Sequence, residues 1–112
     1  MTAPRLNRAL VLEAPIFASD GAGGFSETWA ALGTLWAQVA PRSGRETATG
    51  GVAVSRMGYK ITVRAAPEGS AARPAPQQRF RIGVRVFNIE AVTEQDTDAR
   101  YLICFAHEEF AT

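Results

Sequence analysis

The chain has 112 residues, which is close to the usual size of one domain, so we expect residues 1–112 to form a single domain. Hydrophobic residues make up 46% of the sequence and charged residues 21%, which excludes the polar, highly charged composition of disordered chains. The formal net charge of +1 excludes a strong overall attraction to nucleic acid or to an anionic membrane, so any basic function has to be local.

Targeting and redox signals limit the class of protein further. Glu13 and Pro15 interrupt the apolar run near the N-terminus, so no signal peptide is expected and the mature chain is expected to start here. No window holds the roughly 18 apolar residues that a membrane helix needs, and no membrane partner is expected. The single cysteine, Cys104, excludes an intrachain disulfide and suits a reducing compartment.

The chain begins with a predicted strand and a turn. The mostly apolar residues 6–12 indicate a first strand with an irregular outer face, and Pro15 is expected to end it. Residues 19–24, with the sequence SDGAGG, concentrate residue types that tolerate positive φ. They therefore predict a hairpin turn or an open loop between strands.

A second strand is expected from residue 25 to residue 39. Gly33 lies near its middle, which indicates two strand halves joined by a bend or a β-bulge. Trp29 and Trp36 lie in the two halves. Tryptophans can stack on nucleic-acid bases, but tryptophans within a strand pattern favour packing in the core.

Residues 41–57 have the least core-like composition in the chain. They are rich in Gly, Ser, Thr and Ala, and they predict a long mobile loop. At most one short helix is expected there, a single turn around residues 45–48, because Gly50 and Gly51 would end it. The next residues, 59–64, alternate apolar and polar side chains and give the clearest half-buried strand in the sequence.

The remaining residues predict a connection, a hairpin and a final strand. Residues 67–78 contain three prolines and are expected to form a solvated connection that does not pack. Apolar parity switches within residues 79–92, which predicts a tight hairpin that turns near Gly83. A turn at 94–98 and a strand at 100–105 follow. Six to seven strands spaced by turns predict an all-β fold, a small antiparallel β-barrel or sandwich.

A search for catalytic or metal-binding residues gives no strong candidate. His107 stands beside two glutamates, but one histidine with adjacent carboxylates rarely completes a metal site, so a solvated or hydrogen-bonded surface histidine is expected. Cys104 lies within a strand and is expected to behave as a small buried hydrophobe. Glu94, Asp96 and Asp98 lack the later glycine and bidentate glutamate of a calcium loop. We expect no catalytic residues, metal or cofactor, and no enzyme activity.

Arginine supplies eleven of the twelve basic residues, and it gathers in two regions. Arg79, Arg81 and Arg85 lie in the predicted hairpin, whereas Arg42, Arg45 and Arg56 lie in the predicted loop. One interpretation is that strand arginines face solvent and pair with Glu90 or Glu108. The other is that they contact phosphates or acidic patches on a neighbouring subunit, since the planar guanidinium suits interfaces.

The order of these features resembles the phage head-tail joining family, whose members are also known as head closure or stopper proteins. The resemblance spans nearly the whole chain, although each motif alone is a generic strand. It rests on Trp36-Ala37-Gln38-Val39, Gly44-Arg45-Glu46, Ile61-Thr62-Val63-Arg64, and Gly83 followed by Phe87-Asn88-Ile89. One departure is the small-residue run after Glu46, where similar proteins often carry a more helical segment.

The resemblance implies a structural connector in a virion or phage-like gene transfer agent, assembled in the bacterial cytoplasm. It implies a homo-oligomeric ring, expected to be a hexamer, between portal and adaptor proteins on the head side and the tail terminator on the tail side. The ring would gate and conduct double-stranded DNA, which would pass through its channel without sequence specificity, and a change in the conformation of the predicted loop could retain or release that DNA. The candidate channel or interface loop comprises Arg42, Ser43, Gly44, Arg45, Glu46 and Arg56, and the candidate interface hairpin comprises Arg79, Arg81 and Arg85.

Two other classes stay open. An OB-like small barrel that binds single-stranded nucleic acid would show affinity that falls steeply with salt, and the near-zero net charge counts against it. A small-ligand binder or an unrecognised hydrolase would need a pocket with convergent polar groups, which the sequence does not indicate.

Overall fold

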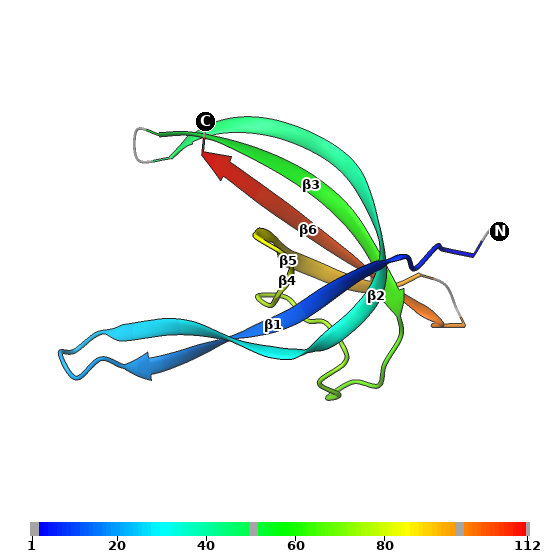
Figure 1. The fold of residues 1–112 in the computed structure, drawn as a ribbon, viewed down its shortest axis with the longest axis horizontal. Helices are drawn as coiled ribbons and strands as arrows, with labels where there is room; N and C mark the ends of the chain where they lie inside the picture. Colours follow the sequence, from blue (N-terminus) through cyan, green and yellow to red (C-terminus); the bar gives the residue numbers. More distant parts are fainter. Residues whose placement is uncertain (1–2, 50–51, 96–97, 112) are drawn as a thin grey trace.

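The computed structural model describes residues 3–49, 52–95 and 98–111, and for residues 43–49, 52–55 and 110–111 it describes the backbone alone. It contains six strands: β1 (Arg8–Ser19), β2 (Phe25–Thr49), β3 (Val52–Arg64), β4 (Arg79–Ile82), β5 (Arg85–Glu94) and β6 (Tyr101–Ala111). The antiparallel sheet closes in the order β1-β2-β3-β6-β5-β4, with β4 paired to β1 (Figure 1). The predicted all-β fold and antiparallel barrel are confirmed. Within the described ranges, no helix has the length and apolar character to span a membrane.

Alternating side chains from every strand fill the barrel. The buried cluster comprises Leu10, Leu12, Ala37, Ile61, Val63, Phe80, Phe87, Ile89, Leu102, Cys104 and Ala106. Ile61 and Val63 confirm the predicted half-buried strand, and Cys104 is buried as expected. Burial raises the pKa of the Cys104 thiol to about 12, so at neutral pH it is an uncharged apolar group rather than a nucleophilic thiolate.

The first strand runs further than the sequence predicted. Pro15 does not end it, because β1 continues to Ser19 and pairs with β2 over its whole length. The pairing of β1 with β4 covers only Val11 to Glu13, so the stretch of β1 around Pro15 has an open edge on that side. Proline is tolerated on such an edge, where a missing N–H group does not break a central ladder.

The predicted bend at Gly33 is confirmed as a β-bulge. Leu12 pairs with Gly33 and Glu13 pairs with Ala31, so one residue of β2 has no partner on β1. Gly33 has a φ of 152°, which side-chain-bearing residues rarely adopt. The bulge separates the half of β2 that belongs to the barrel from the half that leaves it.

Residues 41–49 and 52–57 are strand and not loop, and no helical turn forms at 45–48. Pairing of β2 with β3 continues from Ser43 with Gly58 to Thr49 with Val52. β6 lies along β3 as far as the pair between Val54 and Ala111. A third strand therefore supports this hairpin. The threonines and valines of the hairpin also have high β-propensity.

Three other predictions concern the connection at 67–78, the β4–β5 hairpin and the two tryptophans. The connection at 67–78 does pack, because Pro74 is fully buried and the backbone of Gln77 and Gln78 bonds to that of Ile89. The hairpin of β4 and β5 is confirmed, with its turn at Gly83, where φ is 59°. The prediction that both tryptophans pack in the core was wrong: Trp36 is 60% exposed, and Trp29 is only partly buried.

Candidate functional site

Two groups of strands project beyond the barrel (Figure 1). The first, called here the β1–β2 arm, consists of residues 14–19 and 25–31 with the turn between them. The second, the β2–β3–β6 arm, consists of residues 43–49, 52–57 and 108–111. The radius of gyration is 15.4 Å, whereas a compact chain of this length has about 13 Å. The arms account for this excess and form the most extended surfaces of the molecule.

The β1–β2 arm exposes large apolar side chains. Phe25 is 75% exposed, Phe17 63% and Ile16 49%. Phe17 lies opposite Glu27 in the ladder, so an aromatic ring and a carboxylate stand side by side on one face of the ribbon. Sequence reasoning missed these phenylalanines, although the Gly-rich turn that they flank was a hairpin signal.

The tip of this arm is held by Asp20. Its Oδ1 accepts hydrogen bonds from the backbone N–H groups of Ala22 (2.8 Å) and Gly24 (3.1 Å). These two bonds favour the ionised form of Asp20 and therefore lower its pKa, and the bond from Ala22 has the larger effect. The predicted turn at 19–24 is therefore an ordered hairpin end, which fixes the positions of the phenylalanines beside it.

The base of the β2–β3–β6 arm carries the described side chains of the predicted loop. Arg42 lies at a register shift in β2, and its guanidinium stacks 4.6 Å from the ring centre of Phe105. Arg56 pairs with Glu109 at 2.7 Å. The other predicted residues, Ser43, Gly44, Arg45 and Glu46, are paired in β2 with Gly58, Met57, Arg56 and Ser55 of β3. The structure therefore places this candidate set on the two paired strands of a hairpin, residues 42–46 on β2 and Arg56 on β3.

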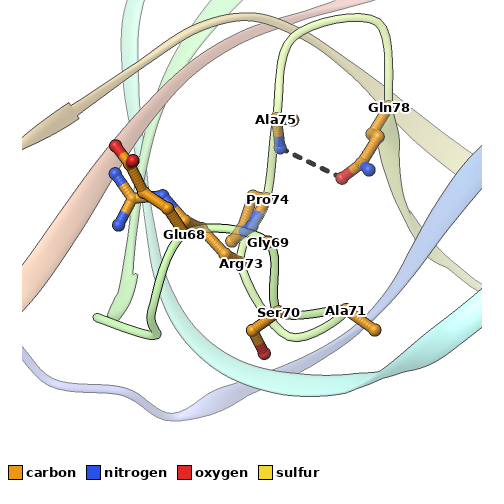
Figure 2. Close-up of a pocket in the computed structure, with 8 residues that line it drawn as sticks. All are labelled: Glu68, Gly69, Ser70, Ala71, Arg73, Pro74, Ala75 and Gln78. Carbon is orange, nitrogen blue, oxygen red and sulfur yellow. Dashed lines mark hydrogen bonds between the residues drawn. The ribbon is translucent and has the colours of Figure 1, made fainter.

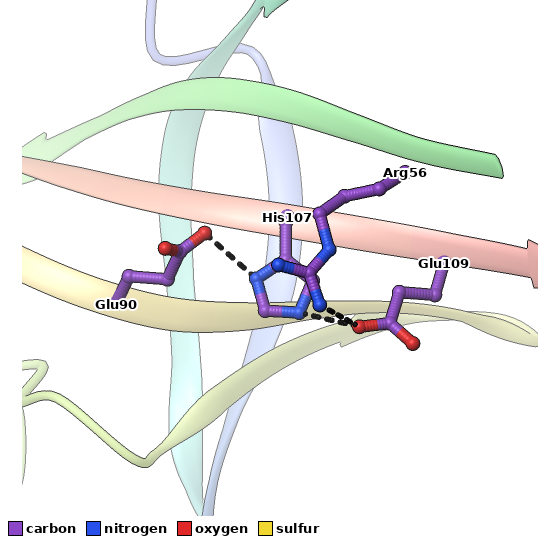
Figure 3. Close-up of polar contacts among 4 residues, drawn as sticks. All are labelled: Arg56, Glu90, His107 and Glu109. Atoms are coloured by element: carbon purple, nitrogen blue, oxygen red, sulfur yellow. Dashed lines mark hydrogen bonds and ion pairs between the residues drawn. The ribbon is translucent and has the colours of Figure 1, made fainter. Parts of the chain in front are cut away.

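His107 connects this arm to the barrel wall (Figure 3). Its Nδ1 lies 2.7 Å from Glu90, the unpaired residue of a bulge in β5, and its Nε2 lies 3.0 Å from Glu109. The prediction of a hydrogen-bonded histidine is confirmed. The bond from Arg56 to Glu109, ahead of the contacts with His107, lowers the pKa of Glu109. In the described part of the chain, no three His, Cys, Asp or Glu side chains are placed to hold a metal ion.

At the base of the β1–β2 arm, a buried carboxylate joins two of the predicted hairpin arginines. Glu13 accepts hydrogen bonds from Arg79 Nε at 2.7 Å and Arg81 Nε at 2.8 Å. Burial alone would raise the pKa of Glu13, but the bonds from Arg81 and Arg79 outweigh it and lower that pKa. Arg79 also stacks 4.0 Å from the ring centre of Trp29. Both guanidinium groups therefore serve to anchor the arm to the barrel.

The third hairpin arginine caps the barrel interior. Arg85 donates from Nε and Nη2 to the two oxygens of Glu108, each at 2.9 Å, and Tyr59 donates to Glu108 at 3.3 Å. These bonds to Glu108 raise the pKa of Arg85. The ring of Tyr59 meets that of Phe87 edge-on at 5.0 Å. A bidentate ion pair thus lies directly above the apolar core.

All three arginines of the β4–β5 hairpin form ion pairs with glutamates of the same chain. Pairing with Glu108 is confirmed for Arg85. Arg79 and Arg81 pair with Glu13, which sequence reasoning had not considered, and Glu90 pairs with His107 instead. Glu13 was missed because a single glutamate at the end of an apolar strand gives no local sign of its partners, which lie 66 and 68 residues away.

A shallow depression with a volume of about 500 Å³ lies beside the loop at 68–78 (Figure 2). Several of the polar groups that line it are already hydrogen-bonded within the chain. Ala75 N–H donates to Gln78 Oε1 at 3.0 Å, and Arg73 donates to the carbonyl of Ala66 at 3.0 Å. A small-ligand site needs several polar groups that converge on an enclosed space. This depression does not have that character.

Comparison with known proteins gives a consistent result. No curated protein matches the sequence. A chain described as belonging to the virion of a native gene transfer agent particle has the same fold, with a TM-score of 0.90 and 50% sequence identity over 98% of this chain and 100% of that chain. The family model for phage head completion proteins matches residues 1–109. The chain therefore belongs to the phage head completion protein family.

Proposed function

We propose that this protein forms a homo-oligomeric ring, most simply a hexamer, at the head-tail junction of a phage or gene transfer agent particle. The ring stands between portal and adaptor proteins on the head side and the tail terminator on the tail side. It is assembled in the bacterial cytoplasm, and double-stranded DNA passes through it without sequence specificity. The chain itself catalyses no reaction.

The family match over residues 1–109 is the observation that carries this proposal. Membership of the family gives the chain a structural role in a phage or phage-like particle. The 50% identity to a chain of a gene transfer agent virion supports that setting. A closed ring needs two different contact surfaces on each copy, because its interfaces are head-to-tail. The two arms give the subunit extended surfaces beyond the barrel (Figure 1).

Weak attraction to DNA agrees with a conduit. The net charge is +1. Arg79 and Arg81 form ion pairs with Glu13, and Arg85 forms one with Glu108. A channel lined with unpaired arginines would hold the phosphate backbone and slow its passage. We assign DNA retention to the β2–β3–β6 arm, where the candidate residues at 42–46 and Arg56 lie.

The experiment that tests the ring is native mass spectrometry of the purified chain, alone and with the portal and adaptor proteins encoded beside it. A closed oligomer on the portal–adaptor complex is the expected result. A chain that stays monomeric in the presence of these proteins contradicts the proposal. Salt-sensitive binding of single-stranded DNA by such a monomer favours the nucleic-acid alternative instead.

A shortened hairpin tests the assignment of DNA retention. Replacement of residues 46–55 by Asn-Gly keeps the pair between Arg45 and Arg56 and closes it with a favoured two-residue turn. The ring should still assemble, while filled heads that carry the variant should lose DNA to added nuclease. Heads that stay protected would mean that another element retains the DNA, with the ring itself unaffected.

A further inference from the structure

The β1–β2 arm has the features of a surface that is covered by a partner. It is a two-stranded ribbon: within the described residues, β1 beyond Glu13 pairs only with β2, and β2 before Ala37 pairs only with β1. A ribbon of two strands is only marginally stable by itself in water. Phe17 and Phe25 nevertheless project into solvent from this ribbon. Exposed aromatic side chains on a projecting element are typical of interface anchors.

The charge of the arm restricts the partner. Residues 14–31 contain Asp20 and Glu27 and no Lys, Arg or His. Both acidic residues are exposed, and Glu27 stands beside Phe17. A complementary surface therefore combines basic side chains with apolar or aromatic ones.

Such a surface exists on the barrel of the same chain, and we call it the basic wall. It consists of the outward side chains of residues 36–42, 60–64 and 101–105, which contain three basic residues and no acidic residue. Its exposed members are Trp36, Arg42, Lys60 and Arg64, with Tyr101 and Phe105 partly exposed between them. Arg42 lies over the ring of Phe105, and the other five side chains have neighbours along the strand that belong to the buried core, so they point outward.

We infer that the β1–β2 arm of each copy docks on the basic wall of the next copy. In Figure 1 the arm extends to the left, whereas the end of β3 and the start of β6, which carry much of the wall, lie at the right. One chain therefore cannot satisfy its own two surfaces, but successive copies can. The contact is heterologous, and repetition closes it into a ring. This inference rests on the proposed ring and names the surfaces that form it.

Photo-cross-linking tests the identity of the occupant. p-Benzoylphenylalanine in place of Phe17 is incorporated into the full chain, which is assembled on the portal–adaptor complex from a mixture of unlabelled and 15N-labelled copies. Mass spectrometry should find cross-links from position 17 to wall peptides, with both isotopes in one product, as contacts between copies require. Cross-links to a head or tail protein, cross-links within one copy, or none in an intact ring would overturn the inference.

A charge exchange tests the same contact through assembly. Glu27→Arg and Arg64→Glu should each reduce ring yield by about tenfold, since each places like charges together. The double variant should recover most of the yield, because every interface of the ring then contains one exchanged charge from each side. Failure of the double variant to recover, with both single variants folded, would argue against this pairing of surfaces.

Serine substitutions separate this inference from the function on which it rests. Phe17→Ser with Phe25→Ser removes the aromatic anchors, and Val84→Ser is the matched control, since Val84 is 98% exposed in the β4–β5 turn. The double variant should lose the ring while the control keeps it. A ring that forms normally without the phenylalanines overturns the arm assignment and leaves the connector function in place. A wild-type chain that never assembles overturns both.

Discussion

The barrel and the β1–β2 arm use the same kinds of residue in opposite ways. In the barrel, Phe80 and Phe87 are fully buried, and the charges of Glu13 and Glu108 are met by arginines of the same chain. In the arm, Phe17 and Phe25 are mostly exposed, and the acidic Glu27 lies beside them. The barrel buries its aromatic side chains and pairs these charges within the chain, whereas the arm leaves its aromatic side chains and its carboxylate exposed and available to a partner surface.

This difference indicates which residues serve folding and which serve assembly. Burial of a large aromatic side chain contributes to the stability of the free chain, and an exposed one contributes little until a partner covers it. Substitutions in the two regions should therefore separate the free energy of unfolding of the monomer from the yield of assembled rings.

The largest difference is expected between two phenylalanines. Phe80→Ala should lower the free energy of unfolding of the isolated chain by about 3–5 kcal/mol, because it removes a ring from a closed core and leaves a cavity. Phe17→Ala should change it by less than about 0.5 kcal/mol. Urea denaturation followed by tryptophan fluorescence measures both. Similar losses from the two variants would mean that the arm packs against its own barrel.

The next effect concerns the carboxylate that anchors the arm. Glu13→Gln should lower the free energy of unfolding by about 1.5–3 kcal/mol, since it weakens two charge-assisted hydrogen bonds at a buried position. Glu27→Gln on the exposed arm is the matched control and should be near neutral. Thermal denaturation of the three proteins under one buffer condition gives the comparison.

The pH dependence of this effect follows from the lowered pKa of Glu13. A group whose pKa is lower in the folded state contributes stability above its unfolded pKa, about 4.3 for glutamate, and loses it as the pH falls through the folded value. The wild-type advantage over Glu13→Gln should therefore be complete at neutral pH and shrink in acid. An advantage that stays constant from pH 7 to pH 3 would contradict the role of the ionised carboxylate.

The paired ions above the core should give a smaller and mutual effect. Arg85→Met and Glu108→Gln, made singly and together, form a double-mutant cycle. We expect a coupling energy of about 1–2 kcal/mol, discounted because Arg85 is partly exposed to solvent. Two variants whose effects simply add would mean that the bidentate contact contributes nothing beyond its separate side chains.

The parts of the fold that sequence reasoning predicted are those in which one face of a strand is buried. Residues 59–64 and the hairpin at 79–92 show alternation because alternate side chains enter the core. The β2–β3–β6 arm was mistaken for a loop, because its small, polar residues 43–49 show no such alternation and its strand pairing extends to β6, more than fifty residues away. Local pattern carries no information about that partner.

For the candidate site, the sequence likewise indicated which residues matter but mostly not what they contact. The arginines of the β4–β5 hairpin were identified by residue type, but the predicted partners, Glu90 or Glu108, were correct for Arg85 alone. Trp36 was expected in the core because buried tryptophan is the usual case, and only the register of β2 turns it outward. Neighbours far apart in sequence decide these positions, and a single sequence does not report them.

The smallest effect is expected at the ion pair between Arg56 and Glu109, whose side chains are 45% and 42% exposed. Arg56→Gln should change the free energy of unfolding by about 0.5 kcal/mol or less, and added salt should reduce even that, because solvent screens the pair. The bond from Arg56 lowers the pKa of Glu109, so in the variant this pKa should rise toward its ordinary value. NMR titration of the Glu109 carboxyl measures that rise. Because the variant hardly alters the stability of the monomer, any loss of DNA from heads that carry it reflects a role of the β2–β3–β6 arm in the assembled ring.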